Sequence, residues 1–315
     1  MNLQQLRYLQ EIARQGLNVS GAAAALFTSQ PGVSKQVRLL EEELGIRIFE
    51  RSGKRLTGVT EAGRQVLEIA GRLLAEVGNL KRVGADYATQ SAGTLDIATT
   101  HTQARYVLPA VVKQFMARYP AVRLRLHQGN PEQVAAWVSQ GDADIGIATE
   151  ALAEAPDLVT LPCYQWKHVV IAPPGHPLLD ATTRPLSLKA LAGWPLITYD
   201  PSFTGRTRID LAFEQAGIVP NIVLTAVDSD VIKTYVELGL GIGIIAAMAF
   251  DPARDIGLSA LAGDTLFDSN MTRLAFRRGN WLRRFDYDFI ELFAPQLTRR
   301  VVESALRGSD PDPGL

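Results

Sequence analysis

The sequence contains very little cysteine and no long apolar run. Cys163 is the single cysteine among 315 residues, which excludes an internal disulfide framework and is typical of proteins from a reducing compartment. No apolar stretch approaches the ~20 residues that span a bilayer. The N-terminal segment MNLQQLRYLQEIARQG is amphipathic and charged, unlike a signal peptide. We therefore expect a soluble protein of the cytoplasm.

Patterns of catalytic residues are also missing from the sequence. The four histidines stand at spacings that match no metal-binding motif. Cys163 has no activating partner near it in the sequence and is expected to be a packed residue. The glycines of GLGIGI at 239–244 follow a predicted helix and precede a predicted strand, which is the reverse of a dinucleotide-binding loop. We expect no enzymatic activity, no metal and no cofactor.

Neither sign of charge dominates, although the two ends of the chain differ. Residues 1–90 carry 12 basic and 9 acidic side chains, whereas the remaining residues carry 20 and 24. After the polar segment 90–93, helical spacing of apolar residues gives way to the alternation of strands. The sequence therefore predicts an α/β fold with an all-α N-terminal part, and a different task for each part.

The first ninety residues contain three helical patterns. In the first, the apolar residues at helical spacing are Leu3, Leu6, Leu9, Ile12 and Ala13. A short second helix is expected over 20–26 and a third over 29–44. Ser29 can cap the third helix, Pro31 is tolerated in its first turn, and Gly45 ends it. Its expected buried stripe consists of Val33, Val37, Leu40 and Leu44.

The solvent face of helix 29–44 has an unusual order of charge. Its N-terminal half presents Gln30, Ser34, Lys35 and Arg38, and its C-terminal half presents Glu41, Glu42 and Glu43. Acidic residues normally favour the first turn of a helix and basic residues the last, so local stability does not explain this order. A polyanion at the N-terminal end does explain it. A basic turn around Gly53, with Arg51, Lys54 and Arg55, is expected to form a small wing. The alternative is a three-helix bundle with incidental surface charge.

The segment that begins at Thr60 predicts a helix with an apolar seam. The seam residues are spaced by four and three in turn, as in a coiled coil; they are Val66, Ala70, Leu73, Val77 and Leu80. This helix lies between the two parts of the chain, which favours a dimerisation helix over the alternative of a helix packed on its own domain.

Beyond residue 93, strands alternate with helices. Strands are expected at 94–100, 122–129, 143–150, 168–174, 195–200, 221–227, 241–246 and 273–278, and helices at 104–118, 131–140, 206–216, 229–238 and 282–294. This alternation favours mainly parallel sheets, in which ligands bind beyond the carboxyl ends of the strands. The segments at these ends are TTHTQAR (99–105), ATE (148–150), DPSFTGR (200–206) and DSD (228–230). Two of them run directly into helices, whose first N–H groups can cradle an anion.

The first ninety residues closely resemble the winged helix-turn-helix of LysR-type transcriptional regulators. SQPGVSKQVRLLEEELG, IFERSGKRL and TEAG carry this resemblance. The segments TTHTQARYVLP, IATEAL, LPCYQW, FTGR and DSDVIKTYVELGLGIGI resemble the effector-binding domain of the CysB-type subgroup. The resemblance implies a winged helix-turn-helix at 1–59, a linker and dimerisation helix at 60–91, and a two-lobed effector domain, similar to a periplasmic binding protein, at 92–315. Its lobe I would span about 92–163 and 266–300, and its lobe II about 164–265.

The resemblance also implies site residues and partners. The residues expected to contact DNA are Ser29, Gln30, Pro31, Ser34, Lys35, Arg38, Arg51 and Lys54. Those expected around an effector are Thr100, Thr102, Gln103, Thr149, Trp166 and Thr204, with His101 at the rim. The implied partners are double-stranded operator DNA, further copies of the chain in a dimer or tetramer, and RNA polymerase.

The implied function is regulation of sulfur assimilation, cysteine biosynthesis or organosulfur use, with acetylserine, sulfate, thiosulfate or adenosine phosphosulfate as effector. The expected cavity consists mostly of neutral hydrogen-bond donors. Sulfate is satisfied by donors alone, whereas partly protonated phosphate needs an acceptor, so the cavity favours sulfate, thiosulfate or a carboxylate. Glu150 would weaken this argument if its side chain turned inward. Two other classes stay open, a solute-binding protein for an oxyanion with no DNA role and an enzyme acting on a sulfur metabolite.

Overall fold

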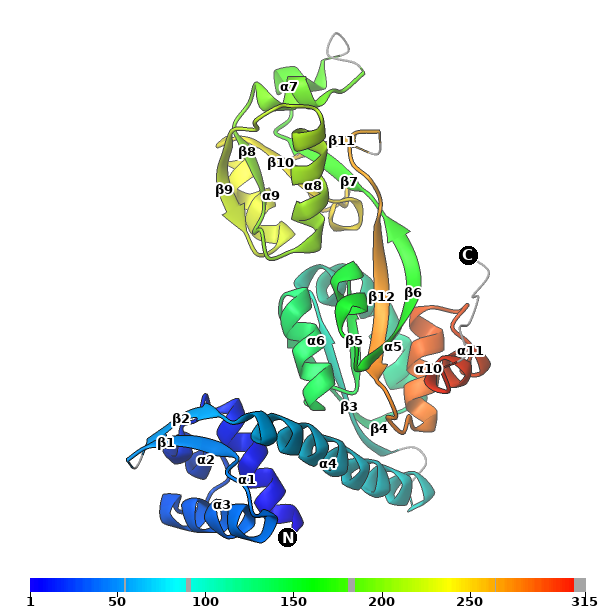
Figure 1. Cartoon of the computed structure of the whole chain (residues 1–315). Helices are drawn as coiled ribbons and strands as arrows, with labels where there is room; N and C mark the ends of the chain where they lie inside the picture. The colour runs from blue at the N-terminus through cyan, green and yellow to red at the C-terminus, as the bar shows by residue number, and fades with distance from the viewer. Residues whose placement is uncertain (54, 89–91, 181–184, 264, 309–315) are drawn as a thin grey trace. The chain divides into compact units, whose positions relative to one another are not determined.

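The computed structural model describes residues 1–53, 55–88, 92–180, 185–263 and 265–308 (Figure 1). The chain divides into two compact units, Met1–Ala85 and Asp86–Leu315. Among the described residues, none of the helices combines the length and the apolar character that a membrane crossing requires.

The first unit consists of helices and one two-stranded hairpin. Its elements are α1 (Leu3–Arg14), α2 (Val19–Ala25), α3 (Gln30–Leu44), β1 (Phe49–Ser52), β2 (Arg55–Val59) and α4 (Glu61–Ala88), which continues past the unit boundary. Helix α3 begins after Ser29 because the Ser29 hydroxyl accepts a hydrogen bond from the Gly32 N–H at 3.3 Å. It ends at Gly45, whose left-handed φ of 67° favours glycine. The expected helix therefore has the expected ends.

Three residues of this unit differ from the prediction. Leu3 and Leu44, expected in buried stripes, are 43% and 40% exposed, because they are the first residue of α1 and the last of α3, where a helix end extends past the core. Glu41, expected on the solvent face, is buried. Its carboxylate accepts hydrogen bonds from the N–H groups of Ile48 and Phe49 at 2.9 and 3.2 Å.

The start of α4 is held by Thr60 and Gly63. The Thr60 hydroxyl accepts from the Gly63 N–H at 2.9 Å and donates to the carbonyl of Arg47 at 2.6 Å. A Cβ atom on Gly63 would lie 2.1 Å from the carbonyl oxygen of Ile48, so only glycine fits there. The TEAG segment thus fastens α4 to the chain that precedes the hairpin.

The second unit has two lobes, each built on a five-stranded sheet. The first sheet has the order β4-β3-β5-β12-β6 and consists of β3 (Ala92–Thr99), β4 (Ala121–Gln128), β5 (Ile145–Ala148), β6 (Leu158–Trp166) and β12 (Asn270–Arg277). The second has the order β11-β7-β10-β8-β9 and consists of β7 (His168–Ala172), β8 (Leu196–Tyr199), β9 (Ile222–Ala226), β10 (Ile242–Ala246) and β11 (Ser259–Ala262).

Helices and single helical turns connect these strands or follow the last of them. They are the π-helix η1 (Gln103–Val107), α5 (Leu108–Arg118), α6 (Pro131–Gln140), η2 (Glu150–Glu154), η3 (Pro177–Leu179), α7 (Leu188–Ala192), α8 (Thr204–Gln215), α9 (Ser229–Glu237), η5 (Ala247–Ala249), α10 (Arg284–Phe293) and α11 (Arg299–Leu306). Of these, the helices α7 and α11 and the short turns η2, η3 and η5 were not expected from the sequence.

The prediction of mainly parallel sheets is wrong. In each sheet two neighbouring pairs are parallel and two are antiparallel. The sequence reading missed β6 and β11, and both enter antiparallel pairings. No helix separates β6 from β7, so the chain passes from one sheet to the other without the crossover that a parallel connection needs.

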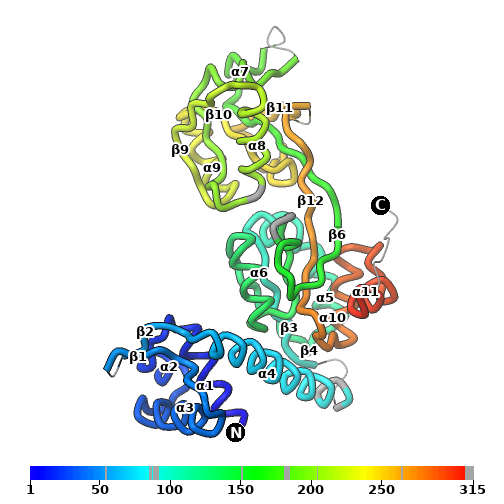
Figure 2. Tube along the Cα trace, viewed as in Figure 1, coloured from blue at the N-terminus to red at the C-terminus, as the bar shows by residue number. Residues whose placement is uncertain are grey.

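The two lobes are joined by β6 and β12. These strands pair antiparallel along their length, from Asn270 opposite Trp166 to Arg277 opposite Leu158, and both views show them side by side between the lobes (Figures 1 and 2). Strand β7 of the second sheet begins only two residues after Trp166. Trp166 therefore lies at the junction of the lobes.

Candidate functional site

The N-terminal half of α3 presents polar and basic side chains to solvent. Gln30, Lys35 and Arg38 are exposed and Ser34 is half-buried. The amide of Gln30 donates to the Ser34 hydroxyl at 3.0 Å, so these two side chains form one exposed polar pair. The first turn of α3 contains no acidic residue. A polyanion can therefore approach this end of the helix without repulsion from its own first turn.

The hairpin that follows α3 has the form of a small wing, and its basic residues differ in their surroundings. Strands β1 and β2 pair antiparallel around Gly53, whose φ is 61°. Arg51, expected to contact DNA, pairs with the buried carboxylate of Glu41 at 2.6 Å. Because Glu41 also binds the backbone at the start of β1, it ties the guanidinium of Arg51 to the base of the wing. Lys54, also expected at DNA, lies outside the described residues.

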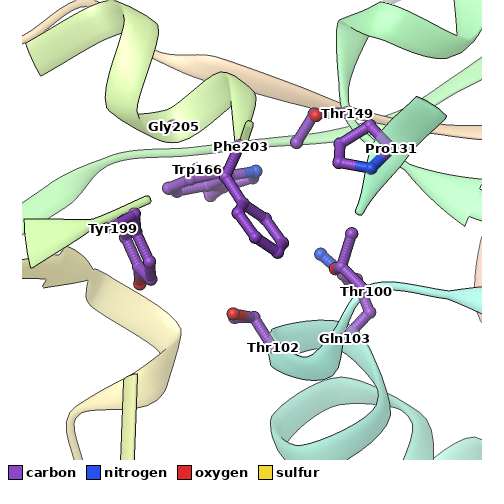
Figure 3. Close-up of a pocket in the computed structure, with 9 residues that line it drawn as sticks. All are labelled: Thr100, Thr102, Gln103, Pro131, Thr149, Trp166, Tyr199, Phe203 and Gly205. Atoms are coloured by element: carbon purple, nitrogen blue, oxygen red, sulfur yellow. The ribbon is translucent and has the colours of Figure 1, made fainter. Parts of the chain in front are cut away.

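A cavity lies between the two lobes of the second unit (Figure 3). Its volume is about 390 Å³, open mouth included, and its lining residues are Thr100, Thr102, Gln103, Pro131, Thr149, Trp166, Tyr199, Phe203 and Gly205. Five of the six residues expected around an effector line it. The side chain of the sixth, Thr204, lies outside the described part of the chain, but its neighbours Phe203 and Gly205 line the cavity.

Strand ends and helix starts place these residues together. Thr100 follows β3, Thr149 follows β5, and Phe203 precedes α8. Four lining residues were missed by the sequence reading: Pro131, Tyr199, Phe203 and Gly205. Their positions at strand ends and helix starts were a usable signal, but proline, glycine and aromatic residues do not by themselves indicate ligand chemistry.

Gln103 is buried and rigidly held. Its amide nitrogen donates to the Thr272 hydroxyl at 3.2 Å, and its amide oxygen accepts from the Tyr164 hydroxyl. Thr272 and Tyr164 face each other across β12 and β6. The strands that join the lobes therefore fix the orientation of Gln103 before any ligand arrives.

The described residues that line the cavity are neutral, and several of them can donate hydrogen bonds. The indole Nε1 of Trp166 is buried and has no hydrogen-bond partner, and Figure 3 shows this nitrogen on the side of the ring toward Thr149. Helix α8 begins at the cavity with no side-chain cap on its first N–H groups, unlike α3, α6 and α9, whose caps accept from their first turns. Such uncapped N–H groups favour an anion.

Thr102 lies close to Tyr199, a residue of the other lobe. Burial is the main cause that raises the pKa of the Tyr199 hydroxyl, while hydrogen bonds with Ser229, the Ala246 N–H and Thr102 oppose this shift. The Tyr199 hydroxyl lies 2.7 Å from the Ser229 hydroxyl and 2.8 Å from the Ala246 nitrogen. It therefore stays protonated at neutral pH and connects the wall of the second lobe to the TTHTQAR segment (99–105) of the first, which we call the effector segment.

At the rim, Asp230 of α9 joins the two lobes. Its carboxylate contacts His101 at 3.4 Å, Arg105 at 3.3 Å and the Tyr106 hydroxyl at 2.5 Å. Desolvation alone would raise the pKa of Asp230. The hydrogen bonds from Tyr106 and His101 and the nearby Lys233 ammonium outweigh it and lower the pKa to about 2. We call Asp230 with His101, Arg105 and Tyr106 the rim cluster.

The rim cluster resembles a metal site only in part. The ligand atoms of His101, Asp228 and Asp230 lie within 4.8 Å of one another. However, Arg105 and Lys233 already place two positive charges beside Asp230. These charges oppose a metal cation, so the cluster acts as an ion-pair network between the lobes. His101 itself contacts Gln128 and Asp230 and is not among the residues that line the cavity.

Two family models match the chain. Residues 3–64 match the model for bacterial regulatory helix-turn-helix proteins of the lysR family. Residues 88–298 match the model for the LysR substrate binding domain. The first match covers the exposed face of α3 and the wing, and the second covers the cavity.

Curated relatives are similar over almost the whole chain. The HTH-type transcriptional regulator SsuR of Burkholderia cenocepacia is 53% identical over 98% of this chain and 99% of the relative. The HTH-type transcriptional regulator CysB of the same organism is 52% identical over 98% of each chain. Among solved structures, the cofactor-binding domain of the Cbl transcriptional regulator is 45% identical, with a TM-score of 0.66, and covers 69% of this chain and 94% of that chain.

Proposed function

The chain belongs to the LysR family of helix-turn-helix transcriptional regulators, and we propose that it controls genes of sulfur assimilation, cysteine biosynthesis or organosulfur use in response to a small effector. Its similarity to CysB and SsuR over nearly the whole chain supports this assignment. In this proposal residues 1–59 bind DNA, 60–91 join the subunits and 92–315 bind the effector. The observation that carries the proposal is one chain with both an exposed basic α3 and a donor-lined cavity.

The DNA-binding face is proposed to be the N-terminal half of α3 with the wing. Gln30 and Ser34 are placed to reach base edges, while Lys35 and Arg38 are suited to phosphates. Arg51 can offer its remaining N–H groups to the adjacent backbone, since only Nη2 is paired with Glu41. Ser29 and Pro31 at the helix start, and Lys54 in the wing, complete the proposed contact set.

The effector is proposed to be a small anion rich in oxygen acceptors. The Thr100 and Thr102 hydroxyls, the Trp166 indole and the uncapped start of α8 all supply donors. The described residues that line the cavity include no carboxylate; the side chain of Glu150 lies outside the described ones. This chemistry suits sulfate, thiosulfate or the carboxylate of an acetylserine, and suits phosphate less. Three aromatic rings in the wall leave room for the organic part of such an effector.

Assembly is proposed through α4. Part of this helix packs on its own unit, with Ala70 buried and Leu74 against the core, whereas Leu73 and Leu80 are 42% and 74% exposed. The alternative of a helix packed on its own domain thus describes only part of α4. We propose that the exposed apolar residues Leu73 and Leu80 pair with another copy in a dimer, or in a tetramer of two dimers, that acts with RNA polymerase at promoters in the cytoplasm. No enzymatic step is part of this proposal.

The test is a calorimetric titration of the purified full-length protein with sulfate, with phosphate at equal ionic strength beside it. We expect sulfate to bind and phosphate to bind much more weakly. Thr100→Ala is expected to weaken sulfate binding about tenfold, since it removes one donor to a charged ligand. Thr225→Ala, an exposed threonine of β9, is the matched control. Equal binding of both anions would overturn the argument that the donor-lined cavity prefers sulfate, and binding of neither would exclude the oxyanion and leave acetylserine to be titrated next.

A further inference from the structure

Phe27 combines full exposure with a left-handed backbone. Its side chain is 98% exposed and its φ is +51°. Among the described residues other than glycine, only Leu17 shares a positive φ. A bulky side chain in this conformation is strained by its Cβ, and an exposed aromatic ring gains nothing from the core. Phe27 therefore carries two unfavourable features at one position.

The local structure explains why the backbone is left-handed but not why phenylalanine is there. The Phe27 N–H donates to the carbonyl of Ala24 at 3.1 Å, and the Thr28 N–H donates to that of Ala23 at 2.9 Å. This pair of hydrogen bonds is the Schellman ending of α2, with Phe27 at the left-handed position that glycine usually occupies. Glycine there would end α2 equally well and without strain.

Leu17 has the same left-handed backbone as Phe27, but its side chain has a structural role. It ends the turn after α1 with a φ of +68°, and its side chain packs against the core of the first unit. Burial of the leucine offsets its backbone strain. Phe27 has no such contact, because nearly all of its side-chain surface faces solvent.

The place of Phe27 suggests what the ring serves. It lies two residues before Ser29, the cap of α3, and the chain from Phe27 to Pro31 is exposed without interruption. It therefore adjoins the end of α3 that presents Gln30 and Lys35. In a helix-turn-helix, the residues at the N-terminal end of the recognition helix, here α3, enter the major groove. Phenylalanine is among the side chains that make apolar contacts with thymine methyl groups there.

We propose that Phe27 contacts the apolar surface of bound DNA, a thymine methyl group or a deoxyribose face, beside the groove that α3 enters. This inference rests on the proposed DNA-binding function. The unfavourable features of Phe27 in the free protein then have a compensation in the complex, where the ring is removed from water. Phe27 acts as an apolar anchor next to the hydrogen-bonding residues of α3.

Two variants of the full-length protein test this inference. Phe27→Gly removes the ring and relieves the backbone strain, and Phe27→Tyr keeps the ring. The DNA is a duplex selected by the wild-type protein from a random pool. We expect Phe27→Gly to keep or raise the Tm while its affinity for the selected duplex falls about tenfold. Phe27→Tyr should bind within about twofold of wild type, as should Val219→Ala, a control at an exposed apolar residue of the second unit.

The outcomes separate the inference from the proposed function. Equal DNA affinity of Phe27→Gly and wild type would overturn the inference alone, as would a lowered Tm, because the ring would then serve the fold. A wild-type protein that selects no duplex would overturn the proposed function and the inference with it. Replacing each thymine by uracil identifies the contact: affinity lost at one position assigns a methyl group, and affinity kept at all positions assigns a deoxyribose.

Discussion

At the scale of single residues, a few buried polar side chains hold the functional surfaces in place. Glu41 is an example, because its carboxylate binds two backbone N–H groups at the start of β1 and the guanidinium of Arg51. Gln103 is another, held between Tyr164 and Thr272. Glu41 does not itself have to contact DNA, because it orients Arg51. Gln103 is likewise held in a fixed orientation at the cavity wall.

His168 gives a prediction about pH. It is buried at the junction of the lobes, against the rings of Trp166 and Phe267, and burial lowers its pKa from 6.5 to about 4. Below pH 6.5 the imidazole of His168 therefore binds a proton in the unfolded state, whereas in the folded state it does so only below about pH 4. We expect the free energy of unfolding to fall by about 2 kcal/mol between pH 7.5 and 5 from this residue.

Urea unfolding of wild type and His168→Gln at both pH values measures this contribution. The variant is expected to be less stable at pH 7.5 but to lose less stability on acidification, because glutamine does not titrate in this range. Parallel losses in the two proteins would show that His168 is not the group responsible.

Lys35 and Gln30 give a prediction that separates two kinds of DNA contact. Lys35→Ala should weaken binding to every sequence and reduce the slope of log affinity against log salt by about 1. Gln30→Ala should change the preference between duplexes by about 1–3 kcal/mol at one base pair and leave the slope nearly unchanged. Fluorescence anisotropy at several salt concentrations, on two duplexes, measures both, with Lys113→Ala as an exposed control. The same uniform loss in both variants would mean that Gln30 does not read bases.

At the scale of elements, the effector segment is fastened at both of its ends. Strand β3 leads into Thr100 on one side, and the π-helix η1 continues from Gln103 on the other. Arg105 and Tyr106 of η1 are bound by Asp230 of α9. The segment that contributes most of the hydrogen-bond donors in the first lobe is thus tied directly to a helix of the second.

Asp230→Asn tests this connection. The variant keeps one acceptor oxygen for Tyr106 but loses the charge that pairs with Arg105. Because the carboxylate is partly exposed, the loss is moderate, and we expect sulfate affinity to fall about threefold with little change in Tm. Glu303→Gln, which breaks a surface ion pair on α11, is the control. Unchanged sulfate affinity in Asp230→Asn would show that the rim cluster does not position the effector segment.

At the scale of the whole molecule, we propose that the binding of effector and of DNA is linked through an equilibrium between conformations. An effector that binds one arrangement of lobes or subunits better than another shifts the population toward it, and a coupling of about 1–3 kcal/mol is typical of such switches. Both lobes contribute to the cavity, so a change in their arrangement changes the effector site directly. A dimer would place two α3 helices on successive half-sites of an operator.

The exposed leucines of α4 give the prediction for assembly. Replacing both Leu73 and Leu80 by Glu puts charge into the proposed contact between copies, and we expect monomers in sedimentation velocity and a loss of about 100-fold or more in operator affinity, because the two half-sites are then bound independently. Lys81→Glu, a charge change at an exposed neighbour, serves as the control. Intact oligomers in the double variant would show that the copies contact each other through another surface.

The sequence by itself determined the local elements and the family of this protein. Capping and periodicity act over a few residues, so Ser29 and Gly45 already marked the ends of α3, and the four-and-three spacing marked α4. The segments TTHTQAR and FTGR were recognisable as cavity segments because each follows the carboxyl end of a strand, beyond which α/β sheets bind ligands.

Only the tertiary structure decided how these elements combine. The mixed sheets depend on β6, which runs antiparallel to β12 more than a hundred residues later, and no local pattern encodes such a partner. Packing also turned Glu41 inward, left Leu44 outside and brought Tyr199 and Phe203 to the cavity. These outcomes depend on which surfaces meet, and contacts between distant segments are set by burial of the whole chain rather than by neighbours in sequence.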